Sequence, residues 1–186
     1  MSQVVALRRV FQLHLQLEHV QPLIWRRLLV DSRISLPELH NAIQAVMGWY
    51  DSHLHEFFQG RLRFSVPDPE FDAEVQDERH VRLDQLLKKP QDTLHYVYDF
   101  GDDWLHLLTL EAILPWQPNQ VLPLCTQGAR ACPPEDCGGP PGYAELLEVM
   151  ANPQHPEYDD MIDMLGDEFS PEDFDLEFAN EGLANS

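Results

Sequence analysis

The chain has 186 residues, of which 44% are hydrophobic, and a net charge of -20. This length and apolar content predict one compact domain with a buried core and exclude global disorder. Residues 131–186 hold 15 acidic side chains and no Lys or Arg. Direct DNA binding and attachment to anionic lipid are disfavoured, because DNA and anionic lipid are negatively charged and repel this acidic surface. A basic protein partner or a divalent cation suits this surface better.

No segment of the sequence is expected to enter a membrane. A spanning helix needs about 20 apolar residues in a row, and Arg8 and Arg9 interrupt the segment where a signal peptide would have its apolar core. We therefore expect a soluble, cytoplasmic protein. Three cysteines, Cys125, Cys132 and Cys137, are an odd number, so reduced thiols are expected rather than disulfides.

Two strands are predicted near the N-terminus. Apolar and polar residues alternate over residues 10–18, which is typical of a half-buried strand. The pattern restarts over residues 24–30 after a proline, so the two segments are expected to form an antiparallel pair. Arg26 and Arg27 should point to opposite faces of the second strand. Either one could meet an acidic turn further along the chain.

A helix is predicted to follow, ending at Gly48. Ser35 and Glu38 have the spacing of a capping box, with a proline in the first turn, and apolar residues then recur at helical spacing. His40 and Gln44 lie one turn apart on this helix. We expect both of them on its exposed polar face.

A hairpin is predicted over residues 49–66, with its turn at Gln59 and Gly60. His53 and His55 would lie on the same face of its first strand, because side chains alternate along a strand. Such a pair can bind a metal ion. The polar, acidic segment from about 67 to 80 is expected to be a mobile surface loop, and a short helix should follow over residues 81–89.

The central stretch, residues 94–111, has two strand-like runs on either side of an acidic turn. A three-residue loop at 101–103 would make Phe100 pair with Trp104 and Tyr98 face His106.

Two interpretations of this turn remain open. In one, Gly101 supplies a positive φ, the aspartates cap the turn backbone and the aromatic residues form core. In the other, Asp102, Asp103 and His106 bind a cation. Asp99 would lie on the opposite face of the sheet.

Residues 125–142 form a second distinctive segment, in which eight of eighteen residues are Gly or Pro. This composition predicts a shaped loop rather than a helix or a central strand. Long loops in compact domains are usually functional or tied down. Arg130 could pair here with Glu135 or Asp136.

The acidic C-terminal segment is expected to be helical over residues 142–150, from 158 to 165, and from a start at Ser170. Its apolar anchors would be Phe169, Phe174 and Phe178. The predicted fold class is therefore α+β, a single domain over residues 1–186. An antiparallel sheet of hairpins packs against helices, with the core at about 9–183.

Ligands suited to Zn, Ni or Mn gather in three of these segments. The candidate metal ligands are His53, His55, Asp102, Asp103, His106, Cys132 and Cys137. The other side chains expected to line the same groove are Trp49, Asp99, Trp104, Arg130, Glu135 and Asp136. The sequence contains no G-x-S-x-G, P-loop, G-x-G-x-x-G or H-E-x-x-H motif, and the cysteines lack the paired C-x-x-C spacing of a structural zinc site.

Five segments in order resemble the plasmid pRiA4b ORF-3-like family. They are PLIWRRLLV (22–30), LPELHNAIQAVMGWYDSHLHEF (36–57), YDFGDDWLH (98–106), GARACPPEDCGGPPGY (128–143) and residues 169–174. The resemblance implies an α+β domain. Its members are of unknown biochemical function, and some are labelled mobile-element proteins, as transposon passengers or resolvases.

Three functions remain open at this point. The leading hypothesis is a cytoplasmic binding or adaptor domain with a polar His/Asp/Cys groove. The alternative is a metal-dependent enzyme, hydrolase-like, that uses the same groove. A third, suggested by charge alone, is an acidic protein that mimics nucleic acid.

Overall fold

The computed structural model describes residues 7–68, 70 and 74–186. Its described strands form one eight-stranded sheet in the order β5-β4-β3-β6-β7-β1-β2-β8. The strands are β1 (Arg9–Leu17), β2 (Trp25–Asp31), β3 (His55–Gln59), β4 (Leu62–Ser65), β5 (Gln76–Asp77), β6 (Thr93–Tyr98), β7 (Trp104–Pro115) and β8 (Leu124–Ala129). Neighbours pair antiparallel except β4 with β5, which are parallel. The predicted α+β fold with antiparallel hairpins is confirmed.

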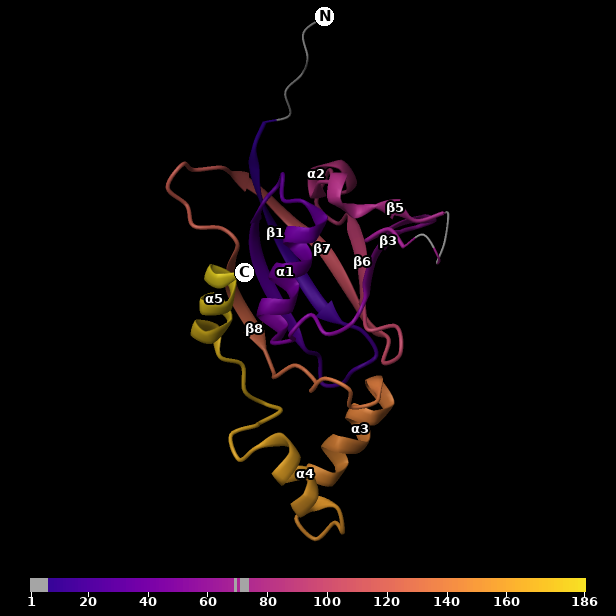
Figure 1. Cartoon of the computed structure of the whole chain (residues 1–186). Coiled ribbons are helices and arrows are strands. Elements are labelled where there is room, and N and C mark those ends of the chain that lie inside the picture. The colour runs from indigo at the N-terminus through magenta and orange to yellow at the C-terminus, as the bar shows by residue number, and fades with distance from the viewer. Residues whose placement is uncertain (1–6, 69, 71–73) are drawn as a thin grey trace, which may run out of the picture.

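The helices occupy one face and one end of this sheet. They are α1 (Leu36–Met47), α2 (Leu83–Leu86), α3 (Gly139–Met150), α4 (Tyr158–Leu165), α5 (Leu176–Asn185) and a 3-10 turn at Glu78–His80. Figure 1 shows α1 lying across the sheet, α5 beside β8, and α3 and α4 below the lower end of the strands. None of the described helices combines the length and apolarity needed to cross a bilayer.

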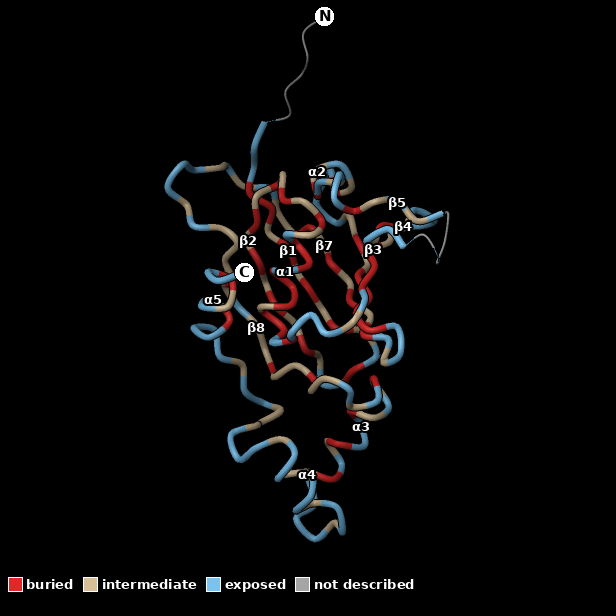
Figure 2. Tube along the Cα trace, in the orientation of Figure 1, coloured by how far each residue is buried: buried red, intermediate tan, exposed pale blue. Residues whose placement is uncertain are grey.

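The core lies between α1 and the sheet, where the buried segments of Figure 2 are concentrated. Buried and half-buried residues alternate along β1 and β2, as predicted. The predicted capping box opens α1: Ser35 accepts from the Glu38 N–H, and the Glu38 carboxylate accepts from the Ser35 N–H. Gly48 ends the helix with a φ of 90°.

The prediction that His40 and Gln44 are exposed is wrong. They are 3% and 5% exposed, because this face of α1 packs on β6. There the Tyr96 hydroxyl lies 2.8 Å from His40 Nδ1 and accepts a 3.0 Å hydrogen bond from Gln44 Nε2. A buried hydroxyl needs such partners, so the polar side chains of α1 are part of the core.

The hairpin predicted over residues 49–66 differs from the structure in two ways. Strand β3 begins at His55, so His53 precedes the strand and the two histidines do not share a strand face. The tight turn lies at Gly60 and Arg61 rather than Gln59 and Gly60, with Gly60 at a φ of 59°. Each residue of β3 therefore pairs with a residue two positions further along the chain than predicted, so that Phe58 faces Arg63 rather than Arg61.

The central hairpin has a longer loop than predicted. Tyr98 pairs with Trp104, so the loop spans residues 99–103 and Phe100 is 54% exposed rather than paired. Asp99 and Asp103 take the positive φ angles that we had assigned to Gly101. The Asp99 carboxylate accepts from the Gly101 N–H at 2.9 Å, which stabilises this conformation.

The glycine- and proline-rich segment is less irregular than predicted. Its first part pairs with β2 as the edge strand β8, and α3 begins at Gly139 rather than at residue 142. Arg130 pairs with Glu172, at 2.6 Å, and not with Glu135 or Asp136. This ion pair connects the segment to the C-terminal tail.

The C-terminal tail packs on the core through a different set of anchors from the one predicted, which includes Ala179 and Leu183 of α5. Helix α5 begins at Leu176, with Asp175 as its cap, and not at Ser170. Phe169 and Phe174 pack against the core, as predicted. Phe178 is 66% exposed, so it is not an anchor.

Part of the predicted surface loop at 67–80 is held in place. Residues 69 and 71–73 of that loop lie outside the described residues. Strand β5 pairs with β4, and the Glu78 side chain is buried, with its carboxylate 2.9 Å from His55 Nε2. Residues 76–80 are therefore tied to the sheet.

We predict that His106 makes the fold sensitive to acid. The side chain is fully buried, and burial lowers the pKa of His106 to about 4. The unfolded chain takes up this proton near pH 6.5, so stability present above that pH is lost between about 6.5 and 4, by roughly 3 kcal/mol. Urea unfolding at pH 7 and 4.5 should show that His106→Leu removes this part of the pH dependence. An unchanged dependence in the variant would contradict the assignment.

Candidate metal centre

Three carboxylates converge on the imidazole of His53 beside the central turn. His53 Nε2 lies 2.9 Å from Asp136 Oδ1, 3.5 Å from Asp99 Oδ2 and 3.9 Å from Glu135 Oε2. Ligand atoms held about 2.1 Å from one ion lie about 3.0–3.4 Å apart in octahedral or tetrahedral geometry. The ligand atoms of His53, Asp99 and Asp136 all lie within 4.8 Å of one another, which is close to the spacing of a cation site, and Glu135 lies at its edge.

Each of these side chains comes from a different connection in the fold. His53 lies between α1 and β3, Asp99 lies directly after β6, and Glu135 and Asp136 lie in the loop between β8 and α3. The cluster therefore forms only when the first hairpin, the central turn and the Gly/Pro-rich segment are packed together.

Hydrogen bonds fix one oxygen of two carboxylates and leave the other facing His53. Asp99 Oδ1 accepts from the Gly101 N–H. Glu135 Oε1 accepts from the Tyr50 N–H at 3.1 Å and from the Tyr98 hydroxyl at 3.0 Å. Glu135 Oε2 and His53 Nε2 are buried atoms that make no well-aligned hydrogen bond among the described residues, although Nε2 lies 2.9 Å from Asp136 Oδ1. Buried polar atoms of this kind call for a ligand, an ion or water.

The Tyr98 hydroxyl, in its neutral form, donates a hydrogen bond that positions Glu135. Its hydroxyl accepts from the Ser52 N–H at 2.9 Å and donates to Glu135. Burial, and then the hydrogen bond to Glu135, raise the pKa of Tyr98 well above its usual value. The phenol therefore keeps its proton at neutral pH and acts as a positioning residue rather than as a base.

Close backbone contact holds the Gly/Pro-rich segment against the central turn. The Gly138 N–H donates to Asp102 Oδ2 at 3.2 Å. Gly139 has a φ of 69°, and a Cβ there would lie 2.3 Å from the Asp102 carbonyl oxygen. Only glycine fits such an approach, so this contact determines where Glu135 and Asp136 lie.

The remaining predicted ligands do not join this cluster. Asp102 binds the Gly138 backbone, and Asp103 is exposed in the turn. His106 lies in the core, with Nδ1 2.8 Å from the Trp104 carbonyl oxygen. His55 bonds Glu78 instead.

The two predicted cysteine ligands also lie outside the cluster. Burial raises the pKa of Cys132 and of Cys137 to about 12. Neither thiol belongs to the group of ligand atoms around His53. All three cysteines are free thiols.

The predicted groove aromatics support the walls of the site. Trp49 donates through Nε1 to the Pro133 carbonyl oxygen at 3.0 Å, and its ring lies 5.0 Å from that of Tyr98. Trp104 is fully buried. Arg130 binds Glu172 and lies apart from the cluster.

A second group of possible ligands joins the predicted ligand His55 to His40 and Asp51, which the sequence analysis did not identify as ligands. The two imidazole rings stack with centroids 3.6 Å apart. His40 Nε2 lies 2.9 Å from Asp51 Oδ1, while its Nδ1 meets Tyr96. These nitrogens already have partners, so the group forms a buried polar network. The signal was present: His40 shares its helix face with Leu36 and Ile43.

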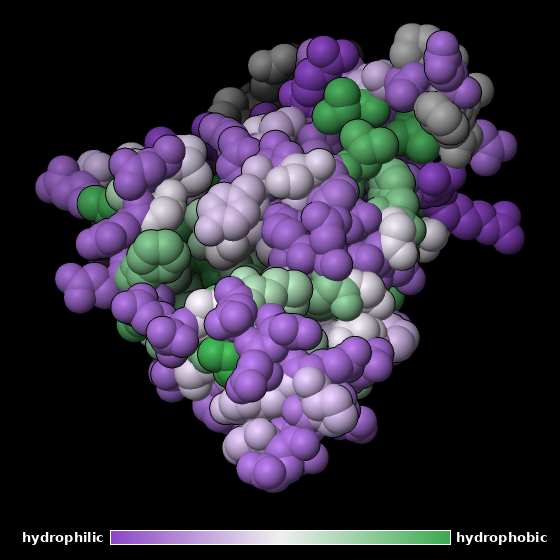
Figure 3. Space-filling view, turned by 60° about the horizontal axis from the view of Figure 1, so that its bottom comes forward, coloured by the Kyte–Doolittle hydropathy of each residue, from purple (hydrophilic) through white to green (hydrophobic). Residues whose placement is uncertain are grey.

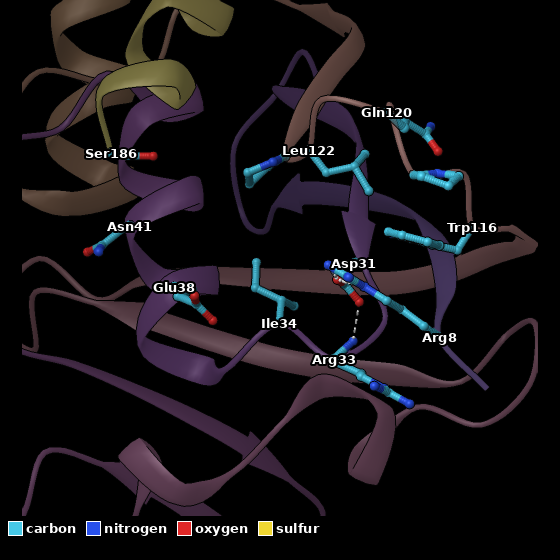
Figure 4. Close-up of a pocket in the computed structure, with 12 residues that line it drawn as sticks. Arg8, Asp31, Arg33, Ile34, Glu38, Asn41, Trp116, Gln120, Leu122 and Ser186 are labelled. Atoms are coloured by element: carbon cyan, nitrogen blue, oxygen red, sulfur yellow. Dashed lines mark hydrogen bonds and ion pairs between the residues drawn. The ribbon is translucent and has the colours of Figure 1, made fainter. Parts of the chain in front are cut away.

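A wider hollow of about 720 Å³ lies elsewhere, between β1, the start of α1 and the β7–β8 connection (Figure 4). None of the predicted site residues lines it. Its charges are largely engaged with each other: Arg8 pairs with Asp31 and lies 4.4 Å from the Trp116 ring centre, and Asp31 accepts from the Arg33 N–H. Glu38 belongs to the capping box.

The fold and this cluster define a small α+β protein with a histidine–carboxylate centre at one end of its sheet. The chain belongs to the plasmid pRiA4b ORF-3-like protein family, whose model matches residues 9–178. The resemblance noted in the sequence is therefore confirmed.

Two relatives agree with this assignment. The chain is 38% identical over 180 residues to the uncharacterized protein y4hQ of Sinorhizobium fredii. The matching region covers 95% of this chain and 89% of that protein. The crystal structure of a protein of unknown function, MM3350, from Methanosarcina mazei matches with a TM-score of 0.83 and 37% identity, over 92% of this chain and 97% of that one. These relatives establish the family and the fold.

We predict that Gly139→Ala displaces Glu135 and Asp136 from His53. The added Cβ meets backbone, which cannot move aside as a flexible side chain can. Gly60→Ala is the matched control, because Gly60 also has a positive φ but open space around its Cβ position. Thermal unfolding should show a loss of about 1 kcal/mol for the control and a clearly larger loss for Gly139→Ala. Equal losses would mean that the contact does not constrain the loop.

Proposed function

We propose that the chain is a binding domain whose ligand at the central turn is a divalent cation. The observation that carries the proposal is the convergence of three carboxylates on one imidazole nitrogen, with two of the facing atoms buried and without a well-aligned hydrogen bond among the described residues. A single Nε2–H can donate to only one of these oxygens. A divalent ion would neutralise and bind the remaining oxygens together.

The donor set decides which ions suit this site. One imidazole with two or three carboxylates favours Mn or Zn, with Ni also possible in chemical terms. A thiolate-bound zinc is not proposed, because neither Cys132 nor Cys137 belongs to the group of ligand atoms around His53. Three free thiols are consistent with a reducing, cytoplasmic setting.

A metal-dependent hydrolase is the second candidate, and the exposure of the cluster favours it. The Asp136 side chain is 73% exposed and that of His53 is 30% exposed, so a bound ion would keep positions open to water. A metal-bound water is the usual nucleophile of such enzymes. The nucleic-acid-mimic hypothesis rests on charge alone and stays a prediction.

We predict that purified protein binds about one Mn or Zn ion per chain, and that His53→Ala and Asp136→Asn each weaken binding at least about tenfold. Calorimetric titration of chelator-treated protein measures the affinity, and mass spectrometry of untagged protein measures the metal content. Circular dichroism should show that both variants remain folded.

The control for this experiment is His80→Ala, which removes an imidazole with an 83% exposed side chain outside the cluster. It should bind metal like the original protein. Metal binding that survives in His53→Ala and Asp136→Asn, or that falls equally in His80→Ala, would place the ion elsewhere. Loaded protein that hydrolyses phosphate or carboxylate ester substrates, with the activity lost in His53→Ala, would favour the enzyme.

A further inference from the structure

A groove of about 580 Å³ opens beside the metal centre. It runs between the C-terminal end of α1, residues 131–135, the end of α4 and the segment that leads into α5. Figure 3 views this end of the molecule and shows hydrophobic residues, in pale green, exposed across its middle among hydrophilic ones. The size and the exposed hydrophobic residues are typical of a surface that binds a partner.

The floor of the groove is apolar and closely packed. Val46 and Met47 are almost fully buried in it. The Phe174 ring lies over the Arg26 guanidinium, with 4.0 Å between the ring centre and the guanidinium carbon. A Cβ at Gly128 would lie 2.5 Å from the Phe174 ring. The absence of a side chain at Gly128 therefore leaves the space that Phe174 fills.

The rim of the groove exposes large apolar side chains. Met164 is 65% exposed, Phe178 is 66% exposed and Tyr50 is 84% exposed. All three line the groove. A partner that covered these side chains would remove their apolar surface from water, which favours binding.

The charge around this apolar surface has one sign. Glu135, Asp173 and Asp175 line the groove. The one basic residue that lines it, Arg26, is 1% exposed and donates to backbone carbonyls of the protein itself. Residues 131–186 carry no Lys or Arg. A partner here meets carboxylates without a competing cation on the groove surface.

We propose that this groove binds a basic amphipathic segment of another protein. The apolar face of that segment would cover Met164, Phe178 and Tyr50, while its Lys and Arg side chains would meet Asp173 and the neighbouring carboxylates. A second copy of this chain is a poor occupant, because each copy has a net charge of -20 and presents the same acidic face. The proposal goes beyond the cation site and does not depend on it.

The test uses a fluorescein-labelled, 18-residue helical peptide with leucines on one face and lysines on the other, titrated against the full chain by fluorescence anisotropy in EDTA. We expect saturable binding that weakens as NaCl is raised. Met164→Ser and Phe178→Ser should each weaken binding at least about threefold, and the double variant about tenfold. EDTA keeps the result independent of cation binding.

Matched variants separate the groove from the rest of the acidic surface. Val121→Ser removes an apolar side chain that is 76% exposed outside the groove, and it should bind the peptide unchanged. Asp173→Asn should weaken binding and its salt dependence more than Glu148→Gln does, although both remove one negative charge. Glu148 is exposed on α3 and does not line the groove.

Three results would overturn the proposal. One is equal binding by Met164→Ser, Phe178→Ser and the original protein. Another is equally tight binding of a lysine and serine peptide that lacks the apolar face, which would show attraction by charge alone. The third is a dimer in analytical ultracentrifugation that Phe178→Ser dissociates, because a second copy would then occupy the groove.

Discussion

The buried guanidinium of Arg26 holds together the elements on which the site and the groove depend. It donates to the carbonyl oxygens of Val46 at the end of α1, of Trp25 in β2 and of Ala129 in β8. Burial lowers the pKa of Arg26 to about 10, so it stays charged at neutral pH, next to the negative end of the helix dipole. Phe174 covers its outer face. One side chain thus connects the helix, the sheet edge and the tail.

The two proposed sites lie next to each other because of this arrangement. The end of α1 leads directly into the segment that carries Tyr50 and His53, and β8 leads into the loop that carries Glu135. Glu135 belongs to both places: one oxygen is held by Tyr50 and Tyr98, the other faces His53, and the side chain lines the groove. The chemistry of this protein is therefore concentrated at one end of the sheet.

Local sequence patterns predicted the elements that local forces determine. Alternation found β1 and β2, and the capping box and Gly48 found α1. The loop of the central hairpin is two residues longer than predicted. Tyr98 still lies on the predicted face, because side chains alternate along a strand and a shift of two residues does not change the face. Which of the ligands meet could not be predicted, since it depends on a backbone contact at Gly139 between segments far apart in the chain.

The tethered strand β5 has a consequence for how this fold can vary. Strand β4 ends at Ser65, and the chain is held again at β5 and at Glu78, whose carboxylate bonds His55. Both ends of the intervening stretch are therefore anchored independently of its length. Doubling a loop of this kind costs only about 0.6 kcal/mol of closure entropy. The pairing of β4 with β5 and the contact between Glu78 and His55 therefore set few limits on the length of the chain between Ser65 and Gln76.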